Sequence, residues 1–258
     1  MPNVTQENID RFSGFADLYN ASRPVPPEII RTCILKYLAS SPELVVDIGS
    51  GTGLSTMIWH GIASRVIGIE PNDDMRSAAE ASVSAGNVAF QKGYSNRTGL
   101  PEGCADVVTI SQAFHWMDIP STLDEVWRIL KPGGVFAVYD ADWPPCVDWM
   151  VEKEYRALNR KCNAVKPPAS FNSKGKHLAR LEEYGRFRFV REAVCHSVEP
   201  CTPERMIGIA TSQGCVQGAL KLDASIEKDV EAYCDVVRER CPETFEIVYS
   251  YRVRLAVK

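Results

Sequence analysis

The chain has 258 residues, of which 45% are hydrophobic and 24% are charged, with a net charge of −4. These values are typical of a water-soluble globular protein with one embellished α/β domain or two small domains, and they give no basic footprint for nucleic acid. No stretch approaches the ~20 apolar residues of a membrane helix, and the polar segment Met1–Asp10 does not resemble a signal peptide, so a cytoplasmic protein is predicted.

The first part of the chain predicts two helices. Apolar and aromatic side chains recur there at helical spacing: Phe12, Phe15, Leu18 and Tyr19. A helix within residues 8–22 would pack this face on the domain, and Arg23-Pro24 would close it. A second helix with a broad apolar face is predicted over Glu28–Ala39.

The stretch Leu44–Ser55 organises the chain. An apolar run with two β-branched residues predicts a buried parallel strand, which stops at three alternating glycines, Gly49, Gly51 and Gly53. Glycines allow a tight turn and let a ligand lie against bare backbone. A helix over Leu54–Ser64, with free N–H groups facing the turn, is predicted to follow.

Three features limit the ligand of this turn. The dinucleotide fingerprint requires a third glycine or alanine where Leu54 stands, and no Gly-Lys-Ser/Thr follows as in a phosphate loop. Asp47 precedes the glycines and would repel a phosphate while favouring an ammonium or sulfonium group. The pattern therefore favours a cationic ligand.

The second predicted strand, Arg65–Ile69, ends at Glu70, which is 70 − 47 = 23 residues after Asp47. An acid in this place can accept hydrogen bonds from both ribose hydroxyls of an adenosine. A further helix is predicted to begin at Asn72, because acidic residues in its first turn suit the helix dipole.

Three further strands are predicted at 88–92, 106–110 and 135–139. Ligands of open α/β sheets collect at the carboxyl ends of strands, so the segment after the fourth strand should meet an acceptor. His115 lies there and is the candidate general base, with a pKa near neutrality, or it merely packs beside Trp116.

Four motifs together resemble the class I S-adenosylmethionine-dependent methyltransferases. They are Asp47-Ile-Gly49-Ser-Gly51-Thr-Gly53, Gly68-Ile-Glu70-Pro71 with Met75, Ala105-Asp106-Val107-Val108, and Leu130-Lys131-Pro132-Gly133-Gly134. The resemblance covers about residues 15–142. It implies a Rossmann-like, seven-stranded, mostly parallel sheet with an antiparallel final hairpin and a helical cover, and S-adenosylmethionine as the cofactor, leaving S-adenosylhomocysteine.

The resemblance also implies a cofactor site. The segment from Phe12 to Pro24 is similar to that of enzymes related to the trans-aconitate and ubiquinone-pathway methyltransferases, in which Tyr19 and Arg23 would cover the methionine moiety. Ser95 or Asn96 would replace the acid that often reads adenine. The implied cofactor-binding residues are Tyr19, Arg23, Asp47, Gly49, Ser50, Gly51, Thr52, Gly53, Glu70, Pro71, Met75, Tyr94, Ser95, Asn96, Ser111, Gln112, Ala113, His115 and Trp116. Pocket lining is favoured over base catalysis for His115.

The C-terminal part carries no readable motif. Helices are predicted over 147–163, 174–184, 202–214 and 224–240, with a break at Pro167-Pro168, and strands over 188–197 and 245–257. The expected division is 1–40 as helices covering the cofactor, 41–142 as the binding core, and 143–258 as a substrate cover with the last two strands. A loose basic patch is either solvated or faces an anionic acceptor: Lys174, Lys176, Arg180, Arg186, Arg188 and Arg191.

The nine cysteines contain no Cys-x-x-Cys pair and are expected to be reduced thiols. Cys195-His196 with Cys201 is the one cluster considered for zinc, and no metal is predicted.

The function expected from the sequence is transfer of a methyl group from S-adenosylmethionine to a small-molecule carboxylate or hydroxyl, by a monomer or homodimer. A non-catalytic adenosyl-cofactor-binding protein and a nicotinamide-dependent oxidoreductase are the alternatives.

Overall fold

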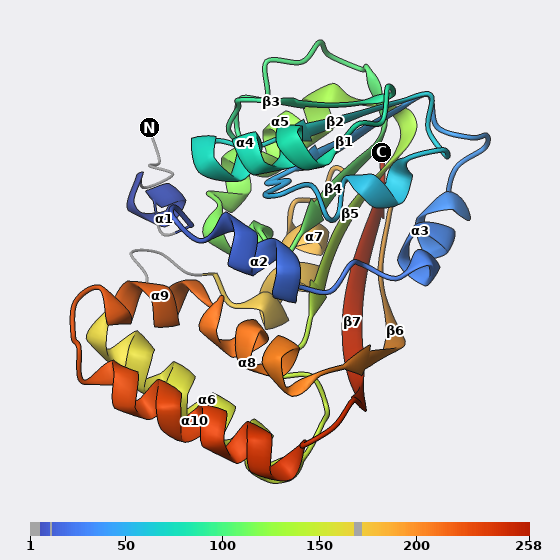
Figure 1. Cartoon of the computed structure of the whole chain (residues 1–258). Helices are drawn as coiled ribbons and strands as arrows, with labels where there is room; N and C mark the ends of the chain where they lie inside the picture. Colours follow the sequence, from blue (N-terminus) through green and yellow to red (C-terminus); the bar gives the residue numbers. More distant parts are fainter. Residues whose placement is uncertain (1–5, 11, 168–171) are drawn as a thin grey trace.

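The computed structural model describes residues 6–10, 12–167 and 172–258 and shows a seven-stranded sheet beside a group of helices (Figure 1). The strand order is β3-β2-β1-β4-β5-β7-β6. The strands are β1 (Leu44–Ile48), β2 (Arg65–Ile69), β3 (Val88–Gln91), β4 (Ala105–Ser111), β5 (Leu130–Ala141), β6 (Phe189–Cys201) and β7 (Phe245–Val257). The first five are parallel, and β7 runs antiparallel to both β5 and β6. The predicted fold class is confirmed.

The helices fall into groups along the chain. They are α1 (Gln6–Asp10), α2 (Ala16–Ser22), α3 (Glu28–Leu35), α4 (Asp73–Ser82), α5 (Ile119–Ile129), α6 (Trp149–Val165), α7 (His177–Glu183), α8 (Pro203–Thr211), α9 (Gly214–Leu220) and α10 (Ile226–Arg240), with short 3-10 turns η1 (Met57–Trp59), η2 (Phe114–Trp116) and η3 (Lys174–Lys176). Helices α6, α8, α9 and α10 pack together as a cover at one end of the sheet, and α2 packs on α8 (Figure 1).

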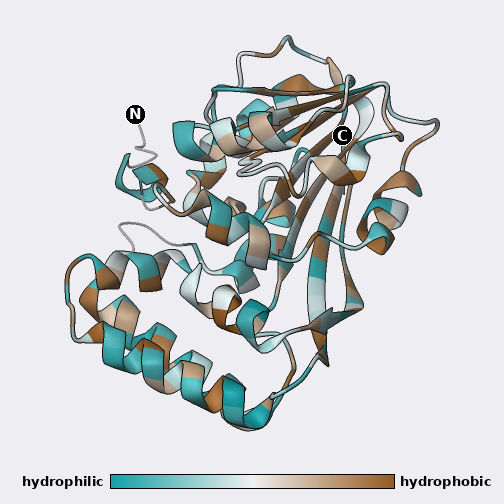
Figure 2. Ribbon diagram, in the orientation of Figure 1, coloured by the Kyte–Doolittle hydropathy of each residue, from teal (hydrophilic) through white to brown (hydrophobic). Residues whose placement is uncertain are grey.

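The sheet is buried on both faces because alternate residues of each central strand point to opposite sides. Val45 belongs to the buried cluster that includes residues of α3, η1 and the cover helices, whereas its neighbour Val46 belongs to the cluster that includes α5. The strands are accordingly hydrophobic, while the exposed side of α10 is largely hydrophilic (Figure 2). This burial holds the carboxyl ends of β1, β2 and β4 at one edge, where the glycine turn lies.

Two predicted helices differ from the structure. Residues Leu54–Ser64 contain the 3-10 turn η1 and no α-helix. The hydroxyls of Ser55 and Thr56 donate to Asp47, and side-chain bonds of this kind compete with helical structure. The single helix expected within 8–22 is divided into α1 and α2 by a turn in which Gly14 has a φ of +88°.

The C-terminal elements follow the sequence more closely. Strand β7 has the predicted bounds, and α6, α7 and α10 lie within a few residues of theirs. The helix predicted over 202–214 ends earlier as α8, and α9 follows it. Pro168 of the predicted break lies outside the described residues. All nine cysteines are free thiols.

None of the helices in the described parts of the chain is long and apolar enough to cross a membrane.

Gly68 of β2 lets Phe90 of β3 and Ser50 of the glycine turn pack closely against the strand. A Cβ atom there would lie 2.5 Å from Cδ1 of Phe90 and 2.8 Å from Oγ of Ser50. Gly68→Ala must displace the Phe90 ring, so we expect the free energy of unfolding to fall by about 2 kcal/mol. Urea unfolding tests this, with Gly86→Ala as the matched control, because a Cβ at Gly86 meets no atom within 4 Å. Equal stability of the two variants would contradict the packing argument.

Candidate cofactor and acceptor site

The glycine turn after β1 is held by the end of β2. Gly49, Gly51 and Gly53 have φ angles of +73°, +55° and +89°, which favour glycine. The backbone N–H groups of Gly49 and Ser50 both donate to the carbonyl of Ile69, at 2.8 and 3.2 Å. A Cβ at Gly49 would lie 2.8 Å from Cβ of Ala113, so this glycine also permits the close approach of the segment after β4.

Asp47 lies beneath the turn and not in a cavity wall. Its side chain is fully buried, and its carboxylate accepts hydrogen bonds from Ser55 Oγ at 2.6 Å, Thr56 Oγ1 at 2.8 Å and Thr109 Oγ1 at 2.7 Å. Burial raises the pKa of Asp47 above its ordinary value, and the three hydrogen bonds oppose that shift. The direct contact with a cationic ligand that the sequence suggested is therefore not what the geometry provides. Asp47 instead links β1, the glycine turn and β4.

Glu70 stands at the end of β2, where an acid was expected. Its Oε2 accepts from the N–H of Gly51 at 2.9 Å and its Oε1 from the N–H of Asn72 at 2.8 Å. Burial raises the pKa of Glu70 to about 6, although both hydrogen bonds lower it. Each carboxylate oxygen has a second lone pair, and the side chain lines a cavity. It can therefore accept two further hydrogen bonds from a ligand.

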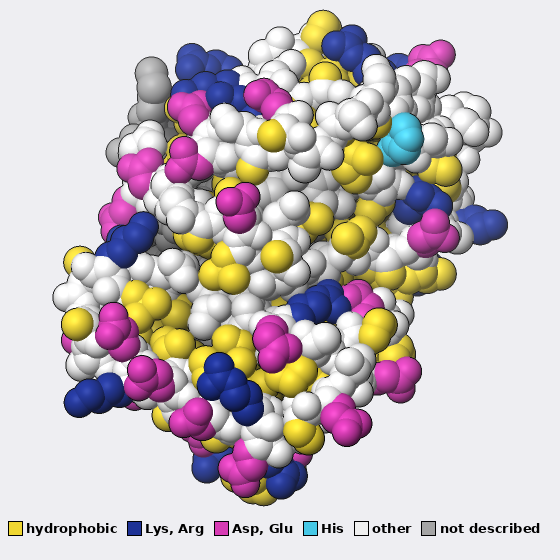
Figure 3. Space-filling model, viewed as in Figure 1, with side chains coloured by type: hydrophobic (Ala, Val, Ile, Leu, Met, Phe, Trp, Pro, Cys, Tyr) yellow, Lys and Arg dark blue, Asp and Glu magenta, His cyan; other side chains and the backbone are white. Residues whose placement is uncertain are grey.

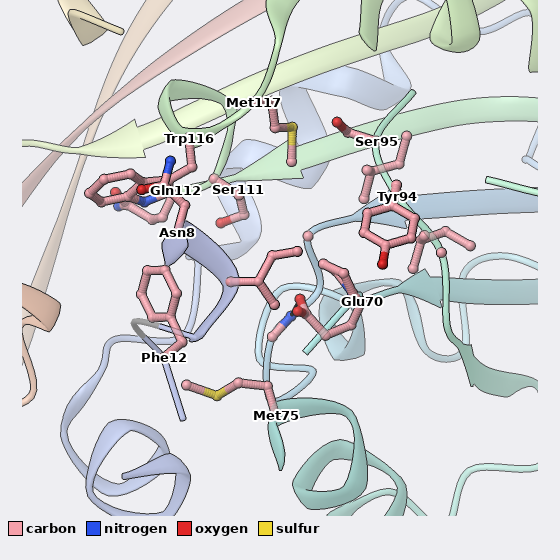
Figure 4. Close-up of a pocket in the computed structure, with 18 of the residues that line it drawn as sticks. Asn8, Phe12, Glu70, Met75, Tyr94, Ser95, Ser111, Gln112, Trp116 and Met117 are labelled. Carbon is pink, nitrogen blue, oxygen red and sulfur yellow. Dashed lines mark hydrogen bonds between the residues drawn. The ribbon is translucent and has the colours of Figure 1, made fainter. Parts of the chain in front are cut away.

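That cavity, here called the strand-end cavity, has a volume of about 120 Å³ and lies at the carboxyl ends of β1, β2 and β4. Figure 4 shows Phe12 and Trp116 on one side of it and Tyr94 and Glu70 on the other. An aromatic and aliphatic lining with one acid suits a flat nucleoside. The full lining is Asn8, Ile9, Phe12, Tyr19, Ile48, Gly49, Gly51, Ile69, Glu70, Pro71, Met75, Gly93, Tyr94, Ser95, Ser111, Gln112, Ala113, Trp116 and Met117.

Two more cavities adjoin the first. The glycine-turn cavity, about 60 Å³, is lined by residues 49–52, 54 and 55 of the turn, Ser111, Gln112, Trp143 and Tyr251, and by Tyr19, Arg23, Pro24 and Pro26. The cover cavity, about 360 Å³, is lined by Phe12, Tyr19, Arg23, Gln112, His115, Trp116, Trp143, Asn159, Asn163, Lys174, Gln213, Gly214 and Cys215. Tyr19 and Gln112 line all three cavities, so the three spaces meet at these side chains.

Gln112 is the one non-glycine residue in the described chain with a positive φ, at 53°. Such a backbone costs energy and is retained when its surroundings fix it, most often at functional sites. Its N–H donates to the carbonyl of Tyr139 at 3.0 Å, and its side-chain Oε1 accepts from Lys174 Nζ at 2.9 Å. The geometry thus directs one side chain from the end of β4 toward the cover.

His115 is buried beside Asp140, at the carboxyl end of β5. Its Nδ1 lies 3.6 Å from Oδ1 of Asp140, and Nε2 of His177 lies 3.9 Å from Oδ2. Burial lowers the pKa of His115 to about 4, against the raising effect of Asp140, and burial lowers the pKa of His177 to about 4 as well. The near-neutral pKa expected of a base is therefore not present at His115.

The ligand atoms of His115, Asp140 and His177 lie within 4.8 Å of one another. Two cations already form ion pairs with the Asp140 carboxylate: Lys174 Nζ is 3.3 Å from Oδ1 and Arg254 Nη1 is 3.1 Å from Oδ2. Burial would raise the pKa of Asp140, but the nearby His115 and the charge of Lys174 outweigh it and lower the pKa. A metal ion here would meet two positive charges, so we propose none.

Most residues implied by the resemblance line one of the three cavities. Those that line none are Asp47, Gly53 and Asn96. Gly53 instead supports the turn, since a Cβ there would lie 2.8 Å from the Phe90 ring. The lining residues outside the predicted set are Asn8, Ile9, Phe12, Ile48, Ile69, Gly93 and Met117 of the strand-end cavity, and Pro24, Pro26, Leu54, Ser55, Trp143, Asn159, Asn163, Lys174, Gln213, Gly214, Cys215 and Tyr251 of the other two cavities. The sequence places Phe12 in the helix expected to pack on the domain and cover the cofactor, and Lys174 in a basic patch that is either solvated or faces an anionic acceptor.

The basic patch is not one surface. Lys174 lines the cover cavity, Arg188 binds the carbonyl of Lys258, and Arg191 donates to the hydroxyl of Tyr37. On the face shown in Figure 3, acidic and basic side chains are intermixed. This face carries no basic region of the kind that binds nucleic acid.

A seven-stranded sheet in this order, with β7 antiparallel and an acid after β2, defines the class I methyltransferase fold. Comparison with known proteins agrees: residues 46–138 match the family of the methyltransferase domain. The resemblance to the class I S-adenosylmethionine-dependent methyltransferases is therefore confirmed.

Among relatives, CRG1 of Saccharomyces cerevisiae, named as an S-adenosylmethionine-dependent methyltransferase, is 31% identical over 137 residues, covering 51% of this chain and 47% of that protein. The chain spans about half the length of the first curated relatives that it matches. A structure described as a type II methyltransferase of Anaeromyxobacter dehalogenans has a TM-score of 0.69 at 18% identity, covering 91% of this chain and 97% of the other. The cyclase SpnF also shares the fold, with a TM-score of 0.55 at 14% identity, covering 99% and 96% of the two chains. These structural likenesses show the fold alone.

Proposed function

We propose that this protein is an S-adenosylmethionine-dependent methyltransferase that acts on a small-molecule acceptor. The observation that carries the proposal is the meeting of three cavities at Tyr19 and Gln112, at the carboxyl ends of β1, β2 and β4. One cavity suits a nucleoside, the second lies on the glycine turn, and the third opens under the helical cover. A donor bound across the first two would present its reactive group to the third.

The chain's own groups fit the cofactor. Glu70 has two carboxylate oxygens available for ribose hydroxyls, and the strand-end cavity offers aromatic and aliphatic surfaces to adenine. Arg23 lines the glycine-turn cavity, makes no ion pair within residues 6–10, 12–167 and 172–258, and is buried at Nε without a partner. We propose that it binds the methionine carboxylate. When bound, the cofactor supplies an electrophilic methyl group on a sulfonium.

The acceptor would enter the cover cavity. Its walls come from the segment after β5, from α6 and from the start of α9, so residues 143–258 would act as the substrate cover and residues 1–40 as the cofactor cover. Enclosure between these parts and the core 41–142 would exclude water and align the acceptor, which are the main requirements of an in-line displacement.

His115 is proposed to line the acceptor cavity and not to act as the base. Its pKa of about 4 keeps the imidazole neutral at pH 7, and a base that weak removes protons inefficiently. The side chain instead packs against Trp116, with ring centroids 4.8 Å apart and the rings tilted by 49°, and it faces Asp140.

Leu54 argues against the nicotinamide alternative, because this leucine lines the glycine-turn cavity where the dinucleotide fingerprint requires a small residue.

The proposed methyltransferase activity is tested by incubating the protein with methyl-labelled S-adenosylmethionine and a small-molecule extract. Label in a small-molecule product is expected, together with S-adenosylhomocysteine. Binding of the cofactor without transfer to any component would favour the non-catalytic alternative.

The affinity for the cofactor should fall in acid. Glu70 has a pKa of about 6 in the free protein, and ribose hydroxyls donate to its ionised form. The raised pKa means that protonation competes with binding as the pH falls through 6. The dissociation constant is therefore expected to rise about tenfold between pH 7 and pH 5. Glu70→Gln should abolish this dependence, and an unchanged slope in that variant would assign the proton to another group. Calorimetric titration at both pH values measures it.

A further inference from the structure

The cover cavity has a charged lining of a single sign. Its cationic side chains are Arg23 and Lys174, and its described lining contains no aspartate or glutamate. The remaining polar groups are side-chain amides, the neutral imidazole of His115, the Tyr19 hydroxyl and the Cys215 thiol, and the aromatic rings include Trp116 and Trp143. A cavity of this kind favours an anion attached to an apolar body.

Lys174 is held in place by two elements that are distant in sequence. Its Nζ donates to Gln112 Oε1 at 2.9 Å and lies 3.3 Å from Asp140 Oδ1. Its backbone carbonyl accepts from Arg254 Nη2 at 3.3 Å. An ammonium has three N–H donors, so one remains for a ligand.

The charges behind Lys174 balance one another. Arg254 pairs with Asp140 at 3.1 Å and with Glu192 at 2.7 Å, so the two acids offset Arg254 and Lys174. Arg23 adds a positive charge on the cavity wall with no acid to offset it. If Arg23 binds the cofactor's carboxylate, Lys174 is the cation that remains for the acceptor.

We propose that the methyl acceptor carries an anionic group, and that Lys174 binds this group and determines specificity for it. The inference rests on the proposed function, since it takes the cover cavity as the acceptor site. The anion is a carboxylate or a phosphate monoester, which present the same acceptor oxygens to an ammonium. Gln112, in contact with Lys174 and lining all three cavities, would place that group next to the donor.

The test uses the protein saturated with S-adenosylhomocysteine and matched pairs of probes. Benzoate with benzamide, succinate with succinamide, and phenyl phosphate with phenol are titrated by calorimetry and by the fluorescence of the cavity tryptophans. At least one anion is expected to bind saturably below about 10 mM, with its neutral partner at least about tenfold weaker. Comparing the carboxylates with phenyl phosphate shows whether the site prefers a carboxylate or a phosphate monoester.

Variants of Lys174 and Lys176 test whether Lys174 is the residue that binds the anion. Lys174→Gln should weaken anion binding about tenfold or more, Lys174→Arg should retain most of it, and Lys176→Gln, on the exposed side of the same turn, should leave it unchanged. Binding of S-adenosylhomocysteine should be unchanged in Lys176→Gln, and each Lys174 variant is saturated with S-adenosylhomocysteine before the anion is titrated. Equal binding of acids and amides, no saturable anion at about 10 mM, or an unaffected Lys174→Gln variant would overturn the proposal. Failure of the unmodified protein to bind S-adenosylhomocysteine would instead overturn the proposed function.

Discussion

Asp47→Ala is expected to lower the free energy of unfolding by about 3 kcal/mol, because hydrogen bonds to a charged group contribute about 1.5 to 3 kcal/mol each. Three buried hydroxyls, those of Ser55, Thr56 and Thr109, would lose their shared acceptor. The loss is less than the sum of three bonds, since removing the carboxylate also relieves the cost of burying its charge.

Urea unfolding measures this change by linear extrapolation. Asp235→Ala is the control, because that side chain is 80% exposed and its ion pair with Arg238 is 3.6 Å long. The control should remain within about 0.5 kcal/mol of the unmodified protein. A loss of less than about 1 kcal/mol in Asp47→Ala would show that Asp47 does not hold the turn to β1 and β4.

Glu70→Ala is expected to weaken the binding of S-adenosylmethionine about 100-fold. Two charge-assisted hydrogen bonds from the ribose would be lost, and together they account for about 3 kcal/mol. The change also removes the acceptors for the N–H groups of Gly51 and Asn72, which shape the cavity wall.

The matched control for this variant is Glu80→Ala. Glu80 lies on α4, is 53% exposed, and contacts Arg76 at 3.6 Å. Its cofactor affinity should equal that of the unmodified protein, whereas Glu70→Gln should fall between the two. Unfolding of Glu70→Ala is monitored in parallel, so that loss of binding is not confused with loss of structure. If a folded Glu70→Ala protein bound the cofactor with unchanged affinity, Glu70 would not be the residue that binds the ribose.

The core of the fold could be predicted because its determinants are local in sequence. The first two strands and their ends are predicted by the apolar run containing Val45 and Val46, by the alternating glycines, and by Glu70 after the second strand. The part of the strand-end cavity wall formed by Gly49, Gly51 and Glu70 follows from these motifs.

Two predictions differ from the structure because of contacts between residues that are brought together only by the fold. Leu54–Ser64 has an apolar pattern, but Ser55 and Thr56 turn toward Asp47, a contact that only the closed turn creates. Asp47 has the sequence position of a ligand contact, yet Thr109 of β4 lies within 2.7 Å and occupies its free oxygen.

The acceptor side was not predictable in the same way. Lys174 is placed by Arg254 and Asp140, residues 114 apart in sequence that meet because β7 pairs with β5. No local pattern marks such a contact. Trp143, Asn159 and Gln213 likewise reach the cover cavity from three separate segments whose packing sets their direction.

The central claim is that the glycine turn and Glu70 bind an adenosyl sulfonium cofactor. The measurement that tests it most directly is isothermal titration calorimetry of the purified protein with S-adenosylmethionine, S-adenosylhomocysteine and NADH. We expect dissociation constants in the range of about 1 to 100 μM for the two adenosyl ligands and no binding of NADH. Binding of NADH without either adenosyl ligand would contradict the claim and establish the nicotinamide alternative in its place.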